Sequence, residues 1–344
     1  MKLDEFHRRF ADAIIEQIRM GTAPWQKPWG GGEPVLPSNV DTGRPYAGGN
    51  SLHLAAVQQA RGYGDTRWGT YRQIQTRGGQ VRKGERGTRI LAFRDHRKVA
   101  VKDGRGRPVR DGDGKRIYRR ERLATPIVRQ YTVFNADQAD GLPARPGPVA
   151  EPSWKVHQEA ERVIADSGVP IQYMTGDRAF YSLEKDEITL PDRVQFPSAN
   201  NYYQTALHEL GHSTGHPERM NRATLIVGMA EGFGSPAYAK EELRAEISAM
   251  MTGDRVGVGH DPSRGAAYVE AWIAALKEDP REIRRAAADA QKISDFVLAR
   301  SRERQAEREA PPVASVRRPG PAPAPQRVLR PELPVPSRSF GPGR

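Results

Sequence analysis

Apolar residues recur at three- and four-residue spacing along much of the chain, a pattern typical of amphipathic helices. In the first twenty residues Phe6, Phe10, Ile14 and Ile18 fall on one face, with charged residues between them. The same spacing predicts helices at residues 3–20, 50–59, 70–76, 154–166, 200–216, 238–250, about 265–277 and 281–299.

Strand patterns occur in two places. Residues 88–93 and 127–134 alternate well enough to form a pair of strands, and residues 179–183 and 187–190 predict a small hairpin with a polar turn. Residues 94–122, between the first pair, are rich in Arg, Lys, Gly and Asp and predict a long loop. A structureless loop of that length is usually functional or disordered.

The domain organisation follows from length and from proline content. A chain of 344 residues predicts two domains, and residues 143–152, with four prolines in ten positions, predict a linker. We therefore expect an α+β fold. Its parts are an α+β domain at 1–142, a mostly helical domain with a small hairpin at 153–302, and a disordered Pro/Arg-rich tail at 303–344.

Charge is divided unevenly between these parts. Residues 1–150 hold 28 Lys and Arg against 15 acidic residues, whereas residues 151–300 hold 17 against 23. Residues 301–344 hold 9 against 4. The first half is therefore expected to bind a polyanion.

Composition excludes several classes of site. The chain has no cysteine, so disulfides, thiolate zinc sites and cysteine nucleophiles are excluded. No stretch approaches the roughly 18 apolar residues of a membrane helix, and the first helix does not read as a signal peptide. We expect a cytoplasmic protein without a membrane partner.

The segment His208-Glu209-Leu210-Gly211-His212 is the most informative motif. On a helix, residues four apart share a face, so His208 and His212 can bind one ion while Glu209 reaches a water bound to that ion. This is the H-E-x-x-H arrangement of zinc peptidases, with two ligands and a general base. No Lys or Arg occurs from Asn200 to His216, which favours a buried functional face.

A zinc site needs a third protein ligand, and two glutamates are candidates. Glu218 lies ten residues after His208, where metzincins have a histidine; Glu242 lies in the helix predicted at 238–250. We favour Glu242 as the ligand and Glu246, one turn later, as the carboxylate that orients a ligand histidine. Ala245 and Ala249 would let two helices approach closely.

The chemistry implied is metal-assisted hydrolysis of a protein or peptide. Zn²⁺ would lower the pKa of its water towards about 7, and Glu209 would take the proton. Tyr202, Tyr203 and Tyr268 are candidates for stabilising the oxyanion. The predicted hairpin at 179–190 could pair with an extended peptide.

The basic half has the composition of a single-stranded DNA surface. Seventeen Lys or Arg fall between Arg82 and Arg129, against six acidic residues. Cations that follow phosphates and aromatic rings that stack on bases give binding without sequence preference. The aromatic residues of this half are Trp25, Trp29, Tyr46, Trp68, Tyr71, Phe93, Tyr131 and Phe134.

Taken together, the motifs resemble the ArdC-type antirestriction proteins, which are related to the N-terminal part of TraC-type plasmid primases. The resembling segments are 24–25 with 28–29, 45–46 with Asn50, 68–73, 81–87, 131–135 with Gln138, 208–216 and 238–246. The long excursion at 94–122 and the tail depart from this pattern.

The resemblance implies a single-stranded-DNA-binding domain joined to a zincin-like domain, in a protein that protects incoming plasmid or phage DNA. The DNA contacts expected from it and from the composition are Trp25, Trp29, Tyr46, Asn50, Trp68, Arg72, Arg82, Lys83, Arg86 and Arg89. Two alternatives stay open: a DNA-associated protease that cleaves host proteins, and a DNA shield whose metal is purely structural.

Overall fold

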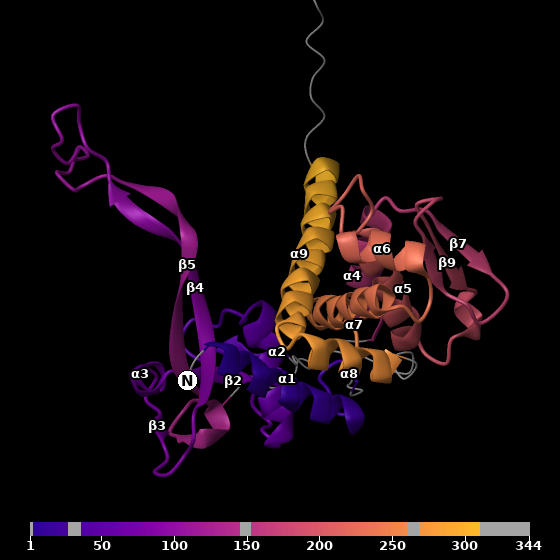
Figure 1. The fold of residues 1–344 in the computed structure, drawn as a ribbon, viewed down its shortest axis with the longest axis horizontal. Helices are drawn as coiled ribbons and strands as arrows, with labels where there is room; N and C mark the ends of the chain where they lie inside the picture. The colour runs from indigo at the N-terminus through magenta and orange to yellow at the C-terminus, as the bar shows by residue number, and fades with distance from the viewer. Residues whose placement is uncertain (1–2, 27–35, 145–152, 260–267, 310–344) are drawn as a thin grey trace, which may run out of the picture.

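The computed structural model describes residues 3–26, 36–144, 153–259 and 268–309, and Figure 1 shows their arrangement. Helices occupy the centre, a long ribbon of β4 and β5 extends from one side, and the sheet containing β7 and β9 lies on the other. The predicted α+β class is confirmed.

In the described residues of the N-terminal part, three helices combine with a four-stranded sheet. The helices are α1 (Leu3–Arg19), α2 (Gly48–Ala60) and α3 (Tyr71–Thr76). The sheet order is β1 (Ser38–Asn39), β2 (Arg67–Gly69), β5 (Tyr118–Asn135) and β4 (Thr88–Ala100), in which β1 and β2 are parallel and the other pairs antiparallel. A second pair joins β3 (Gln80–Val81) to β6 (Ala139–Asp140). Short 3₁₀ turns follow at Ala136–Gln138 and later at Arg193–Gln195.

The prediction of a loop at 94–122 is wrong for residues 94–100 and 118–122, which belong to strands, whereas residues 101–117 between them form turns with isolated bridges. Strand β4 runs 13 residues and β5 runs 18, so the two strands continue far past the predicted ends and pair as a ribbon. The register shifts once, between Arg94 and His96. The ribbon is exposed on both faces, so its side chains show no apolar alternation, and strand pairing through the backbone leaves no such signal in the sequence.

The C-terminal part holds six helices among the described residues and a three-stranded sheet. The helices are α4 (Ser153–Asp166), α5 (Ala199–Ser213), α6 (Ala223–Glu231), α7 (Pro236–Val256), α8 (Val269–Glu278) and α9 (Glu282–Glu309). In the sheet, β9 (Glu187–Pro191) lies between β7 (Ile171–Met174) and β8 (Phe180–Ser182). The predicted hairpin is therefore confirmed, while β7 and α6 were not predicted.

Two predicted boundaries need comment. Helix α9 continues to Glu309, so the prediction of a disordered tail from residue 303 is wrong for residues 303–309. Residues 310–344, and 145–152 of the predicted linker, lie outside the described residues.

The two predicted domains share one hydrophobic core. Phe10 and Ile14 of α1 pack in the same buried cluster as Leu243 and Met250 of α7, together with Trp272 of α8. A second cluster joins α4, α5 and the three-stranded sheet. Helix α7 contributes to both clusters, so the helix that carries Glu242 is buried between the N-terminal helices and the rest of the C-terminal part.

Candidate metal centre

The two motif histidines lie on α5, and their carboxylate partners lie on α7, which packs against it. Ser198 caps α5 by accepting the backbone N–H of Asn201. Gly211 lies at the closest approach of the two helices: a Cβ there would be 2.7 Å from Ser248 Oγ and 3.5 Å from Ala245 Cα. The glycine within the motif thus allows close packing, and Ala245 is one of the small residues predicted at this contact.

Three potential ligand atoms converge between these helices. His208 Nε2 is 3.2 Å from His212 Nε2. The two oxygens of Glu242 lie 3.4 Å from His208 Nε2 and 3.3 Å from His212 Nε2. Atoms bound about 2.0–2.1 Å from a tetrahedral ion lie about 3.3–3.4 Å from one another. The donor set therefore fits a metal ion of zinc-like size.

The other ring nitrogen of each histidine is held by a buried carboxylate. His208 Nδ1 is 3.0 Å from Glu246 Oε2, and His212 Nδ1 is 3.2 Å from Glu241 Oε1. With both Nδ1 atoms donating, both Nε2 lone pairs face the same point, which is the tautomer that a metal ligand needs. Glu246 therefore has the partner predicted for it.

The role of Glu241 was not predicted. Its carboxylate accepts hydrogen bonds from Arg222 Nε at 2.9 Å and from Thr224 Oγ1 at 2.6 Å. The side chains of Glu241 and Arg222 are both buried. One feature of the sequence could have pointed to Glu241. Each of the two ligand histidines needs a hydrogen-bond acceptor for its Nδ1–H, and only Glu246 had been assigned to that role.

The carboxylates create a strongly negative environment between the imidazoles. Burial alone would lower the pKa of His208, but hydrogen bonds to Glu242 and Glu246 outweigh burial and raise it well above its ordinary value. Burial would also lower the pKa of His212. The carboxylates of Glu242 and Glu241 outweigh burial and raise this pKa to about 9. The centre thus favours positive charge at this point, as a divalent cation would supply.

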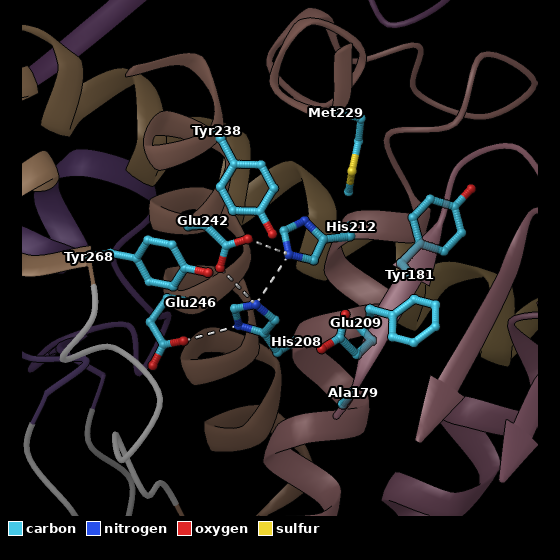
Figure 2. A pocket seen from close by; sticks show the side chains of 11 residues that line it. Ala179, Tyr181, His208, Glu209, His212, Met229, Tyr238, Glu242, Glu246 and Tyr268 are labelled. Carbon is cyan, nitrogen blue, oxygen red and sulfur yellow. Dashed lines mark hydrogen bonds and ion pairs between the residues drawn. The ribbon is translucent and has the colours of Figure 1, made fainter. Parts of the chain in front are cut away.

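A cleft of about 390 Å³ opens onto the three converging side chains. Figure 2 shows Tyr238 and Tyr268 on one side of the histidines, and Glu209 with Tyr181 on the other. Glu209 is 4% exposed. Strand β8 is at an edge of its sheet and lines the cleft through Phe180, which is 42% exposed.

Several alternatives from the sequence are not supported by this geometry. Among the described residues, the one group that could hold a metal is His208, His212 and Glu242; Glu218 is exposed on the turn after α5. The hydroxyl of Tyr202 bonds that of Tyr173, and the hydroxyl of Tyr203 donates to Glu161, so neither lines the cleft. Tyr268 does line it, as does Tyr238, which was not predicted.

Three predicted DNA contacts are corrected by burial or bonding. Trp25 and Trp68 are 0% exposed and lie in hydrophobic clusters, so they have no ring face for a base. The side-chain amide of Asn50 bonds both backbone groups of Leu91, at 2.6 and 3.1 Å, and so joins α2 to β4. Trp29 lies outside the described residues.

The remaining predicted contacts border a different surface. Arg72, Lys83, Arg86 and Arg89 are exposed, as is Arg82, which pairs with Glu85 and Asp140. A surface hollow of about 460 Å³ is lined by Tyr46, Arg72 and Tyr131. Tyr131 is 41% exposed, and Tyr71 and Phe93 are each 46% exposed. Among the described aromatic residues that the sequence suggested for base stacking, these rings, and not Trp25 or Trp68, are the exposed ones, although the guanidinium of Arg284 lies over the Phe93 ring, 4.4 Å from its centroid.

Comparison with known proteins places both halves. The family model described as the N-terminal domain of anti-restriction factor ArdC matches residues 4–134, and one described as zincin-like metallopeptidase matches residues 158–289. Crystal structures of the antirestriction ArdC protein from the R388 plasmid, one metal-free and one Mn(II)-bound, superpose with TM-scores of 0.65. They are 35% and 33% identical, and the matches cover 86% and 88% of this chain and 98% of each of theirs.

Sequence relatives agree. Two proteins named DNA primase TraC from Escherichia coli are 49% and 48% identical over 297 and 296 residues. These matches cover 86% of this chain but only 27% and 20% of the primases, so the chain spans about a quarter or less of their length. An uncharacterized protein, y4eC, from Sinorhizobium fredii (strain NBRC 101917 / NGR234) is 34% identical, over 88% of this chain and 94% of its own.

Proposed function

Because this chain belongs to the ArdC family of antirestriction proteins, we propose that it binds single-stranded DNA without sequence preference and protects incoming plasmid or phage DNA, and that its metal centre is a zinc peptidase site. The observation that supports the centre most directly is the convergence of His208, His212 and Glu242 at tetrahedral spacing. The family model for ArdC and the basic surface of the first half support the DNA partner.

The metal we propose is Zn²⁺, held by His208, His212 and Glu242. Two imidazoles and one carboxylate, without cysteine, form the donor set of catalytic zinc sites, which keep one position for water. The Mn(II)-bound relative shows that a related protein accepts a divalent ion. When bound, zinc would supply a Lewis acid and lower the pKa of a coordinated water.

Residues of the chain itself would orient the ligands, transfer the proton and bind the substrate. Glu246 and Glu241 hold the two imidazoles with Nδ1 protonated. Glu209, in the cleft beside both histidines, is the residue we assign to accept and return a proton. The exposed edge of β8 lies where an extended peptide would add a strand, and Phe180 would contact one of its side chains.

The cleft favours a catalytic centre over a purely structural one. A structural zinc is closed by four protein ligands. Here three donors converge among the described residues, and a buried glutamate and a sheet edge border the same cleft. We propose a protein or peptide as substrate.

For the DNA partner, we propose that the hollow lined by Tyr46, Arg72 and Tyr131 holds part of the strand. An exposed ring beside an exposed guanidinium offers the stacking and phosphate contacts that single strands need. The strand would be met in the cytoplasm, the compartment we propose for this protein. Consistent with this, none of the described helices is long and apolar enough to cross a membrane.

Glu209→Gln separates the competing functions. The variant should keep stoichiometric metal and single-strand binding, because Glu209 is outside the proposed ligand set, but should lose cleavage of any peptide that the wild type hydrolyses. If protection of DNA from restriction is unchanged in this variant, proteolysis is not part of protection, and the shield alternative stands. His208→Ala should lose the metal.

The DNA proposal is tested on the intact chain, since the two halves share a core. Affinity for a single strand should fall steeply with salt, as phosphate contacts require. Arg72→Ala should weaken binding, whereas Arg77→Ala, a matched arginine one and a half turns later whose Nε pairs with Asp41 at 2.8 Å, should have little effect. A salt-insensitive affinity would contradict the proposal.

A further inference from the structure

The outer part of the β4–β5 ribbon, residues 95–122, forms an arm. In Figure 1 the arm extends well away from the helices. At about 3.3 Å per residue, the stretch from Arg94 to Ala100 alone adds roughly 20 Å. The side chains of residues 102–108 and 110–120 are all exposed. This arm is therefore built for contact with something other than the protein's own core.

The tip of the arm is ordered by its own hydrogen bonds. Val101, Val109 and Ile117 form a ring, in which each backbone N–H donates to the carbonyl of another at 2.8–3.0 Å. Asp103 closes one turn by accepting two backbone N–H groups, at 2.9 Å each, and Asp111 closes the next turn in the same way, at 2.9 and 3.1 Å. Two of the tip's acidic side chains are thus used to shape its turns.

The arm concentrates positive charge. Its 28 residues include eleven Lys or Arg and five acidic residues, a net of +6 out of +12 for the whole chain. Repulsion between like charges destabilises a pair of strands, so the excess of positive charge does not help the arm to fold. We therefore expect it to bind an anionic partner.

The strand register places two like charges opposite each other, because Lys98 faces Arg120. Arg122 lies on the same face, opposite His96. Directly opposed like charges destabilise a strand pair. Asp95 contacts His96 at 2.8 Å, but within the described part of the chain neither Lys98 nor Arg120 forms a salt bridge to an acidic side chain.

The pair of residues between these two, by contrast, consists of opposite charges. Arg97 faces Glu121, and the two form a salt bridge at 3.1 Å. Because neighbouring cross-strand pairs project to opposite faces, the face of this ion pair also carries Arg119, opposite Val99, so that one acidic side chain offsets part of its charge. The other face carries Lys98, Arg120 and Arg122, which form no salt bridge to an acidic side chain in the described part of the chain, and it is the more cationic face. A polyanion docked on the cationic face would relieve that repulsion.

Duplex DNA fits the arm better than a single strand does. Single-strand binding needs a series of stacking rings, and Tyr118, 52% exposed, is the one Phe, Trp or Tyr in residues 95–122. A two-stranded ribbon fits the major groove of B-DNA, which is about 12 Å wide, with cations on its face reaching the phosphates.

We propose that the arm binds duplex DNA adjoining the single strand held by the body, so that the protein recognises junctions between single-stranded and duplex DNA. The single-strand half of this statement rests on the proposed function; the duplex half rests on the arm alone.

The test uses the intact protein and one labelled oligonucleotide in three forms: single strand, duplex, and duplex with a single-stranded tail. The arm variant is Lys98→Ala/Arg120→Ala/Arg122→Ala. The matched control is Arg97→Ala/Glu121→Ala, which removes the balanced pair from the other face. Zinc content and thermal denaturation report whether each variant is folded.

We expect the arm variant to bind duplex and junction on the order of tenfold more weakly, with the salt slope reduced by roughly 0.9 for each phosphate that is no longer neutralised. Its affinity for the single strand, and all affinities of the control variant, should match the wild type. A shortened arm, with residues 95–126 replaced by an Asn-Gly turn between the paired residues Arg94 and Ile127, should lose duplex binding while keeping zinc.

Two outcomes would overturn the proposal: duplex affinity that the arm variant and the shortened arm leave unchanged, or an equal loss for all three forms of DNA. Failure of the single-strand proposal looks different. In that case the wild type would bind duplex through the arm but would show no affinity for the single strand.

Discussion

Replacing Gly211 with alanine tests whether the close packing of α5 on α7 sets the metal geometry. The added Cβ would meet Ser248 Oγ at 2.7 Å, well inside contact, while its 3.5 Å distance from Ala245 Cα is ordinary. Either the helices separate by a few tenths of an ångström, or Ser248 turns away and loses its hydrogen bond to the carbonyl of Ala245, at 2.9 Å.

The expected magnitude combines two opposing effects. Over-packing a core contact costs about 1–3 kcal/mol. Alanine in place of glycine inside a helix stabilises the helix by roughly 1 kcal/mol. The net loss of unfolding free energy should therefore be at most about 2 kcal/mol, or a few degrees in Tm. Metal affinity should fall more clearly, since ligand distances tolerate only about 0.2 Å and His212 is adjacent to Gly211.

The assay is calorimetric titration with zinc, together with thermal denaturation, on Gly211→Ala, Ser248→Ala and the double variant. Removing Ser248 Oγ removes the clashing atom, so the double variant should recover both zinc affinity and Tm. If the single variant binds zinc as tightly as the wild type, or if the double variant is no better than the single one, the close approach does not control the site.

Three further predictions follow from other contacts. Glu246→Gln should weaken zinc binding about 10–100-fold by calorimetry, whereas Glu218→Gln should leave it unchanged; equal effects would contradict the assignment of Glu246. Asn50→Ala should lower the unfolding free energy by about 1–3 kcal/mol in denaturant titration, because it leaves buried backbone groups of β4 unpaired. Hydrogen bonding to Arg219 lowers the pKa of Asp186, so the stability from this pair is present above the unfolded-state pKa of about 3.9 and is lost as pH falls below it. Asp186→Asn, which suits the positive φ of 49° at that position, should be less stable than the wild type at neutral pH and equal to it in strong acid; a constant difference at all pH values would refute this.

The metal helix shows what local sequence can predict. The apolar spacing and the i, i+4 histidines both act within one helix, and each was found where the pattern placed it. Glu242 and Glu246 could be proposed because a second helix with the same four-residue spacing offered matching acceptors. Glu241 could not be assigned, because its partner Arg222 comes from a separate segment whose burial depends on how α5, α6 and α7 pack.

The first half shows where local reasoning fails. Trp25 and Trp68 were expected to stack on bases because aromatic residues among cations fit that chemistry, but both are fully buried. Composition shows which types of side chain a segment contains, but not which of them are buried and which are exposed to solvent. The arm was missed for the converse reason, since a ribbon exposed on both faces needs no apolar alternation.

The amino-acid order alone determined the features that one segment can encode: the α+β content, the pair of imidazoles on one helix face, and the excess of positive charge in the first 150 residues. Tertiary packing decided the rest. It brought carboxylates from α7 to the histidines of α5, buried Trp25 and Trp68, and joined helices of the two predicted domains in a shared hydrophobic cluster. The reason is that spacing along the chain fixes neighbours only within a few residues, whereas ligand convergence and burial depend on contacts between segments that are distant in sequence.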